Sequence, residues 1–185
     1  ISNGTAEAVH ILASGSDSAL SDVTVRDLRI TGVETAISAM NLQDGEFSDL
    51  ELFSNADAGL VFAGASTRNN LVDESTFEDN EKGVFLRQAT SGMTIQHSDF
   101  IENHEVAIKT SGSSANEILD NYFDGQDGEK TIHLTGISPD HVIRGNEILN
   151  SAGPGYVGPP APEPPGAGTD DKPPRDSTLE RHPPR

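Results

Sequence analysis

A large apolar residue returns along the chain at intervals of 23 to 25 residues, and a small residue returns in a second phase at nearly the same interval. The apolar phase comprises Ile30, Phe53, Phe77, Phe100, Phe123 and Ile148. The small phase comprises Ala36, Gly59, Gly83, Ala107 and Thr131. A repeat of this length, built from short strand-like segments and turns, is typical of one coil of a parallel β-helix. We therefore predict an all-β parallel solenoid of about six coils.

Each small residue opens a short strand in which apolar side chains alternate with one central residue. Side chains of a strand point alternately to its two faces, so the outer two residues are predicted to face inward and the central one outward. In a parallel sheet, the central residues of successive coils become neighbours about 4.8 Å apart. This outward stripe comprises Ser38, Val61, Phe85, Lys109 and His133.

A second sheet is predicted around the recurring large apolar residue. Five residues before it stand mostly apolar side chains, which are expected to face inward: Val25, Ser48, Val72, Ile95, Ile118 and Ile143. Two residues before it the chain carries Leu28, Glu51, Ser75, Ser98, Asn121 and Asn146. Stacked small polar side chains at an inward corner favour a hydrogen-bond ladder that satisfies backbone amides, although Glu51 breaks the pattern.

Several of these segments resemble the repeat of the right-handed parallel β-helix, in the superfamily of pectate-lyase-like proteins. The resemblance is carried by residues 95–100, 118–123 and 142–148, which read IQHSDF, ILDNYF and VIRGNEI. It implies a right-handed solenoid. The superfamily includes polysaccharide lyases, uronan epimerases, polygalacturonases, virus tailspikes and non-catalytic surface proteins, so the fold alone does not select an activity.

The composition changes after residue 152, which divides the chain into two parts. We expect a β-helix over residues 1–152, with an incomplete first coil that suggests a segment of a longer protein. Ten of the eleven prolines lie in the remaining residues 153–185. Proline favours extended, polyproline-like structure, so this part is predicted to be an extended or disordered arm that could contact a partner or a further copy of the chain.

The charge of the chain restricts its partners. Twelve Lys and Arg residues stand against 30 Asp and Glu residues, for a net charge of −18. Such a surface repels nucleic acid, and we predict no nucleic-acid partner. An acidic, lysine-poor surface is also typical of proteins from high-salt environments. The chain has no cysteine and no long apolar run, so we expect neither disulfides nor membrane insertion.

One candidate catalytic patch surrounds the recurring apolar residue on three coils. It comprises His97, Asp99, Asp120, Tyr122 and Glu147, with Glu74 on the coil before. An imidazole, a phenol and several carboxylates on neighbouring outward positions are the groups that proton abstraction beside a sugar carboxylate, or glycoside cleavage, requires. The alternative is a solvated acidic face without chemistry.

A second candidate site lies on the outward stripe of the other sheet. Phe85 would provide an aromatic face for a sugar ring, and Lys109 and His133 would meet hydroxyl or carboxylate groups. This arrangement predicts a carbohydrate-binding strip. Alternatively, a long turn or the proline-rich arm covers Val61 and Phe85.

The sequence predicts no metal site. Residues 124–129 read DGQDGE and superficially resemble part of a calcium loop. They lack the spacing and the distant bidentate glutamate of such a loop, so an ordinary turn is the favoured interpretation and Ca²⁺ the less favoured one. We expect no other cofactor.

Three functional hypotheses follow from these patterns. The motifs that the resemblance would require of polygalacturonases, pectate lyases or alginate epimerases do not occur in the sequence. The leading hypothesis is therefore an extracellular or virion-surface protein that displays a β-helix and recognises carbohydrate. The alternatives are a lyase or C5-epimerase acting on a uronic-acid polymer, and a trimeric fibre or capsid-associated component.

Overall fold

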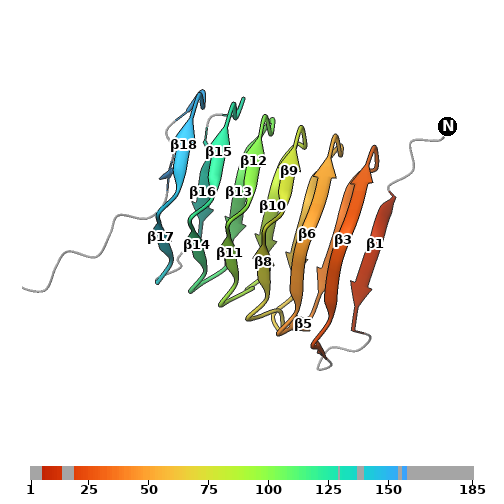
Figure 1. The fold of residues 1–185 in the computed structure, drawn as a ribbon. Coiled ribbons are helices and arrows are strands. Elements are labelled where there is room, and N and C mark those ends of the chain that lie inside the picture. The colour runs from red at the N-terminus through yellow and green to blue at the C-terminus, as the bar shows by residue number, and fades with distance from the viewer. Residues whose placement is uncertain (1–5, 14–18, 129, 137–139, 154–155, 158–185) are drawn as a thin grey trace, which may run out of the picture.

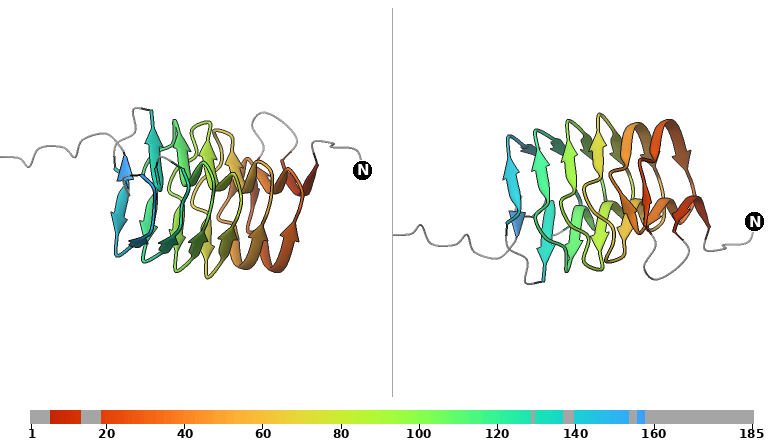
Figure 2. Two further views of the ribbon diagram at one scale, coloured as in Figure 1. Left: turned by 90° about the horizontal axis from the view of Figure 1, so that it is seen from above. Right: turned by 90° about the horizontal axis from the view of Figure 1, so that it is seen from below.

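The computed structural model describes residues 6–13, 19–128, 130–136, 140–153 and 156–157. The chain winds into a parallel β-solenoid of about six coils, stacked along one axis from the N-terminal coil to the C-terminal coil (Figure 1). Two further views show the coils side by side along this axis (Figure 2). In the described ranges, no helix has the length and apolar composition needed to span a membrane.

One wall of the solenoid is a seven-stranded parallel sheet, to which successive coils contribute one strand each. Its strands are β1 (Glu7–Leu12), β4 (Thr35–Met40), β7 (Ala58–Ala63), β10 (Lys82–Arg87), β13 (Val106–Ser111), β16 (Ile132–Thr135) and β19 (Tyr156–Val157). Strand β19 pairs with β16 beyond residue 152, where the arm is predicted to begin. Residues 158–185 of that arm lie outside the described residues.

The other wall is a ten-stranded parallel sheet that bends within each coil. Its strands are β3 (Thr24–Thr31), β6 (Glu46–Phe53), β8 (Leu71–Asp73), β9 (Thr76–Glu78), β11 (Thr94–Gln96), β12 (Asp99–Ile101), β14 (Glu117–Leu119), β15 (Tyr122–Asp124), β17 (Val142–Arg144) and β18 (Glu147–Leu149). Two short strands, β2 (Leu20–Ser21) and β5 (Leu42–Gln43), pair at a corner.

The predicted stripe of the seven-stranded sheet has the expected register. Ser38 pairs with Val61, Val61 with Phe85, Phe85 with Lys109, and Lys109 with His133. Its predicted exposure is wrong at one end, because Ser38 and Val61 are only 3% and 4% exposed. Strand alternation predicts which face a side chain takes, but it cannot show what else packs on that face. The usable outward stripe therefore begins at Phe85.

The predicted apolar column of the ten-stranded sheet is wrong by one residue in the second coil. Leu52, rather than Phe53, pairs with Ile30 on one side and Phe77 on the other. Phe53 points outward, where the Arg29 guanidinium lies 4.7 Å from the centre of its ring. Leu52 and Phe53 are adjacent and both apolar, so the interval of the repeat fits either residue. Because successive side chains of a strand point to opposite faces, a shift of one residue places every side chain of the strand on the wrong face.

The same shift explains why Glu51 and Ser48 break their predicted columns. Leu50 takes the inward corner position expected of Glu51, and Phe47 takes the position expected of Ser48. The backbone amide of Leu50 donates to Ser75 Oγ at 3.2 Å, and that of Ser75 donates to Ser98 Oγ at 3.1 Å. The ladder continues through the stacked side chains of Asn121 and Asn146. The predicted hydrogen-bond ladder is therefore present. In the second coil it begins at Leu50, one residue before Glu51.

Stacked aromatic rings fill the space between the two walls. Phe77, Phe100 and Phe123 are fully buried, and the ring centroids of adjacent coils are 4.9 Å apart with nearly parallel planes. The small residues of the other wall leave room for these rings. A Cβ added to Gly83 would lie 2.8 Å from the Phe100 ring and 2.5 Å from a backbone oxygen, so this position excludes any side chain.

Candidate functional site

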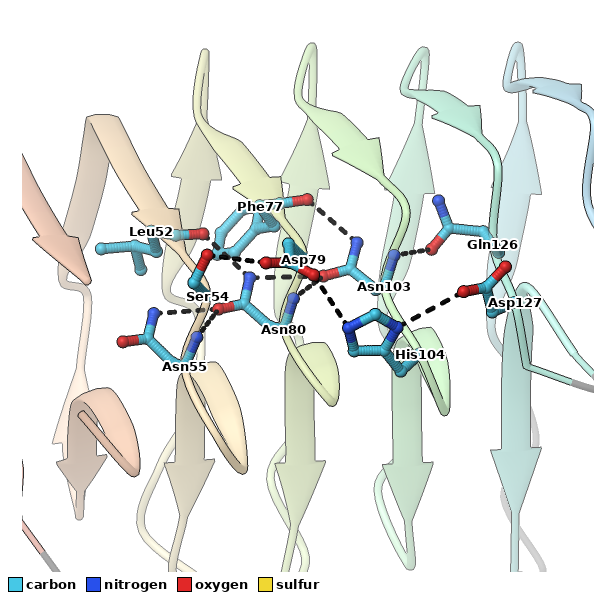
Figure 3. A network of polar contacts seen from close by, with 10 residues as sticks. All are labelled: Leu52, Ser54, Asn55, Phe77, Asp79, Asn80, Asn103, His104, Gln126 and Asp127. Atoms are coloured by element: carbon cyan, nitrogen blue, oxygen red, sulfur yellow. Dashed lines mark hydrogen bonds and ion pairs between the residues drawn. The ribbon is translucent and has the colours of Figure 1, made fainter. Parts of the chain in front are cut away.

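A second polar ladder fixes the turn that leads from the ten-stranded sheet into the seven-stranded sheet (Figure 3). The Asn55 amide donates to Asn80 Oδ1 at 3.1 Å, the Asn80 amide to Asn103 Oδ1 at 3.2 Å, and the Asn103 amide to Gln126 Oε1 at 3.3 Å. The side-chain amides donate to backbone carbonyls, as from Asn103 Nδ2 to Phe77 O at 2.9 Å. All four side chains are buried, so the turns of successive coils are held in one phase.

The residues that follow this ladder form a groove on the outside of the turn. Its volume is about 460 Å³, and its lining combines carboxylates, lysines and two imidazoles. The lining residues come from β13, β16 and the turns before β10, β13 and β16: Glu81, His104, Glu105, Val106, Lys109, Asp127, Gly128, Lys130 and His133.

A row of polar contacts runs parallel to the ladder and ends in the groove (Figure 3). Ser54 Oγ donates to Asp79 Oδ2 at 2.7 Å, and His104 Nε2 lies 2.8 Å from Asp79 Oδ1. The other ring nitrogen of His104 lies 3.4 Å from Asp127 Oδ2. The hydrogen bond from Ser54, helped by His104, lowers the pKa of Asp79. The imidazole thus bridges carboxylates of the coils before and after it.

Two lysines and a glutamate form an ion cluster at the start of β10 and β13. Lys82 Nζ lies 2.9 Å from Asp57 Oδ1 and 3.0 Å from Glu105 Oε2, and Lys109 pairs with the other oxygen of Glu105. Burial alone would lower the pKa of Lys82, but its two carboxylate partners outweigh burial and raise it. Burial likewise opposes ionisation of Glu105, whose pKa is nevertheless lowered by Lys109 and Lys82. Lys82 and Glu105 are therefore both charged at neutral pH.

The C-terminal end of the groove carries Lys130 and His133. Burial, followed by the charges of Lys130 and Lys109, lowers the pKa of His133. The imidazole is therefore neutral near pH 7 and can both donate and accept a hydrogen bond. Within the described part of the chain, no carboxylate lies at ion-pair distance from Lys130.

The groove brings together two of the three residues of the predicted carbohydrate strip. Lys109 and His133 both line it, on adjacent strands in direct register. Phe85 lies beside Lys109 on β10, with the ammonium nitrogen 5.7 Å from the centre of its ring, but it is not part of the lining. An aromatic ring therefore flanks the groove without forming its floor.

The candidate catalytic residues divide into two groups on the opposite wall. Asp99, Tyr122 and Glu147 are paired on adjacent strands and share one outward column. Tyr122 Oη donates to Asp124 Oδ2 at 3.3 Å. Burial, with the charges of Asp124, Glu147 and Asp99, raises the pKa of Tyr122, so its phenol keeps its proton at neutral pH.

His97 and Asp120 lie at a bend of the sheet rather than on this column. Both have a positive φ, at 46° and 53°, and they follow strands β11 and β14. His97 Nδ1 lies 2.9 Å from Asp73 Oδ1 on the coil before, with no hydrogen bond to Tyr122 among the described residues. The structure therefore places the imidazole with a different carboxylate from those of the Tyr122 column.

Sequence reasoning missed most of the groove. The ladder residues Asn55, Asn80, Asn103 and Gln126 recur at the coil interval, and this recurrence could have identified them. The residues that directly follow Asn80, Asn103 and Gln126 are Glu81, His104 and Asp127. The same interval would have predicted that these three lie in one row along the groove. Lys82 and Lys130 have no comparable signal, since their positions depend on turn lengths.

The predicted turn at residues 124–129 supplies a ladder residue. Gln126 is 1% exposed, and its side-chain amide donates to the carbonyls of Phe100 and Asp124. Glu129 lies outside the described residues. Among those that are described, no three His, Asp or Glu side chains are grouped so that they could hold a metal ion.

Comparison with known proteins supports the fold and gives no information on activity. No curated protein and no solved structure matches the chain. A family model described as the right-handed β-helix region matches residues 1–123, which contain most of the coils and the first part of the groove. The chain therefore belongs to the right-handed β-helix family.

Proposed function

We propose that this β-helix recognises acidic carbohydrate through the groove beside β13 and β16. The observation that carries the proposal is the distribution of lysine. The chain has four lysines and a net charge of −18, and three of the four lie in or against this groove. These ammonium groups lie among the carboxylates of Glu81, Glu105 and Asp127, and they provide charged donors to an anionic group of a ligand.

The remaining lining suits a polyhydroxylated ligand. Glu81 and Asp127 can accept hydrogen bonds from sugar hydroxyls, whereas Lys109 and Lys130 donate to hydroxyls or to a carboxylate. The neutral imidazole of His133 can do either. Asp57 and Glu105 already balance the charges of Lys82 and Lys109, so Lys130 is the cation best placed to meet a ligand carboxylate.

Calorimetric titration of the full chain with glucuronate and galacturonate oligosaccharides tests this proposal. We expect Lys130→Gln to weaken binding about tenfold or more, because a hydrogen bond to a charged group contributes about 1.5–3 kcal/mol and 1.4 kcal/mol is a factor of ten. Arg26→Gln is the matched control, since it removes one positive charge from the ten-stranded wall. Equal loss in both variants would show non-specific attraction, and binding unaffected by Lys130→Gln would refute the site.

The column of Asp99, Tyr122 and Glu147 favours a second candidate, a lyase or C5-epimerase acting on a uronic-acid polymer. A phenol that keeps its proton can act as a general acid beside two carboxylates. Lyase action would produce unsaturated sugars that absorb ultraviolet light, and proton NMR would detect epimerisation. Product formed from polygalacturonate or alginate, and abolished by Tyr122→Phe, would support this candidate over simple recognition.

We further propose display at an extracellular, cell or virion surface, with a trimeric fibre or capsid-associated component as the alternative form. An acidic exterior and a solenoid that stacks coils along one axis are compatible with either. Light scattering on the full chain separates them, because a trimer has three times the mass of the 19.6 kDa chain. A monomer would eliminate the trimeric fibre.

A further inference from the structure

A second hollow adjoins the groove on the side of the N-terminal coils. Its volume is about 280 Å³, and it shares Glu81 and His104 with the groove. Its other lining comes from the turns of the first three coils, including Val33, Ser54 and Ala56. The two hollows therefore meet at one coil and together follow the axis of the solenoid.

The two ends of this combined groove differ in chemistry. The end formed by β13 and β16 carries Lys109, Lys130 and His133. Among the described residues, the lining of the second hollow has no lysine or arginine, and two of its ionisable side chains, Asp79 and His104, already contact each other. The far end thus presents mainly backbone, small apolar side chains and a serine hydroxyl.

The length of the combined groove sets a lower limit on the size of a ligand that fills it. Its lining reaches from Val33 in the coil of β3 to His133 in the coil after β15, which is four steps between neighbouring coils. Neighbouring strands are about 4.8 Å apart, so four steps span about 19 Å. Each pyranose unit of an extended oligosaccharide has about the length of one such step, so about four units span the combined groove.

On the basis of the proposed function, we infer that the combined groove binds a linear oligosaccharide of at least four units, which is acidic at one end and neutral at the other. Its acidic unit lies against Lys130 and His133, and its neutral units extend past His104 to Ala56 and Val33. The Asp79–His104–Asp127 row lies where the two hollows join, so it contacts the ligand near its middle. The site thereby distinguishes a mixed acidic and neutral glycan from a uniformly charged one.

Amide NMR spectra of the full chain, recorded with three probes, test this inference. The probes are free glucuronate, a neutral xylotetraose, and a tetrasaccharide of three xylose units ending in glucuronate. We expect the last probe to shift the amides of Val33 and Ala56 as well as those of Lys130 and His133, and to bind at least tenfold more tightly than free glucuronate. If it shifts only the Lys130 end and binds no more tightly, the inference fails and the proposed function stands. If no acidic saccharide binds, the proposed function itself fails.

A blocking variant gives an independent readout. Ala56 is exposed, so Ala56→Phe fills the second hollow without burying the new ring in the core. We expect it to reduce the affinity for the mixed tetrasaccharide to that for glucuronate and to leave glucuronate binding unchanged. Ala65→Phe, on an exposed turn at the other end of β7, is the matched control. Tetrasaccharide binding that survives Ala56→Phe would overturn the inference.

Discussion

Replacing Asn103 by leucine tests the idea that the inner amide ladder, rather than the apolar core alone, holds the groove in place. Asn103 is fully buried, and leucine has the same branched arrangement of heavy atoms in its side chain, although it is larger. The substitution removes Oδ1, which accepts from the Asn80 amide at 3.2 Å, and Nδ2, which donates to the carbonyl of Phe77 at 2.9 Å. It leaves a buried N–H and a buried C=O without these partners.

The expected cost follows from these two groups. An unsatisfied buried donor or acceptor costs about 1–3 kcal/mol, so the pair costs about 2–6 kcal/mol. Leucine recovers part of this through its greater apolar surface, at about 25 cal/mol per Å². We expect a net loss of about 2–4 kcal/mol in the free energy of unfolding, and faster hydrogen exchange at the Asn80 amide.

Urea denaturation followed by circular dichroism measures the loss, and amide exchange locates it. Asn103→Ser is the matched variant, because Ser98 shows that a hydroxyl can accept the ladder amide of the coil before. We expect serine to be better tolerated than leucine despite its smaller apolar surface. A leucine variant as stable as the native chain, or less stable only through a changed m-value, would refute the role assigned to the ladder.

Two further perturbations test the core and the groove. Gly83→Ala should lower the free energy of unfolding by about 1–3 kcal/mol, because the new methyl group would overlap the Ala107 carbonyl and the Phe100 ring; an unchanged denaturation midpoint would contradict this packing. The pKa of His133 is lowered in the folded chain, so the unfolded chain binds more protons and stability falls as pH drops below the unfolded value of about 6.5. His133→Gln should therefore flatten the acid side of a stability profile measured by denaturation between pH 5 and 8, and an unchanged profile would show that another group titrates.

The repeat of the fold could be predicted because it depends on one simple periodicity. Burying Phe77, Phe100 and Phe123 in one stack requires the same side-chain phase in every coil, and this phase is visible as spacing. The exchange of Leu52 and Phe53 was not predictable by spacing, since both are apolar and adjacent. Only the contacts of neighbouring strands decide which of the two faces inward.

The candidate sites were less predictable than the fold, for a physical reason. Lys109 and His133 lie on a regular strand, so alternation alone places them on one face. His97 lies at a bend with a positive φ, where alternation does not apply, and its side chain contacts Asp73 instead of Tyr122. Groups on regular strands can be inferred from alternation, whereas groups at turns require either the interval of the repeat, as for the row beside the ladder, or the structure.

The backbone shows why the groove lies where it does. From the coil of β3 onward, each coil has three residues of positive φ that are spaced five apart. The first set is Asp22, Asp27 and Gly32, and the same three positions recur at Asp44, Asp49 and Ser54, at Asn69, Glu74 and Asp79, at Gly92, His97 and Glu102, at Ala115, Asp120 and Gly125, and at Asp140, Gly145 and Asn150.

Between the first and third of these positions the length never changes, so the ladders stay in phase. The differences in coil length fall instead between the third position and the first of the next coil, which are 13 residues apart from Asp79 to Gly92 and 15 apart from Gly125 to Asp140. That variable segment contains the strands of the seven-stranded wall, including His133 on β16, and the turn with Lys130. A fixed ladder at one edge of the groove and a segment of variable length at the other let the sequence alter a binding groove without disturbing the stack, as expected where function lies on loops held by a fixed scaffold.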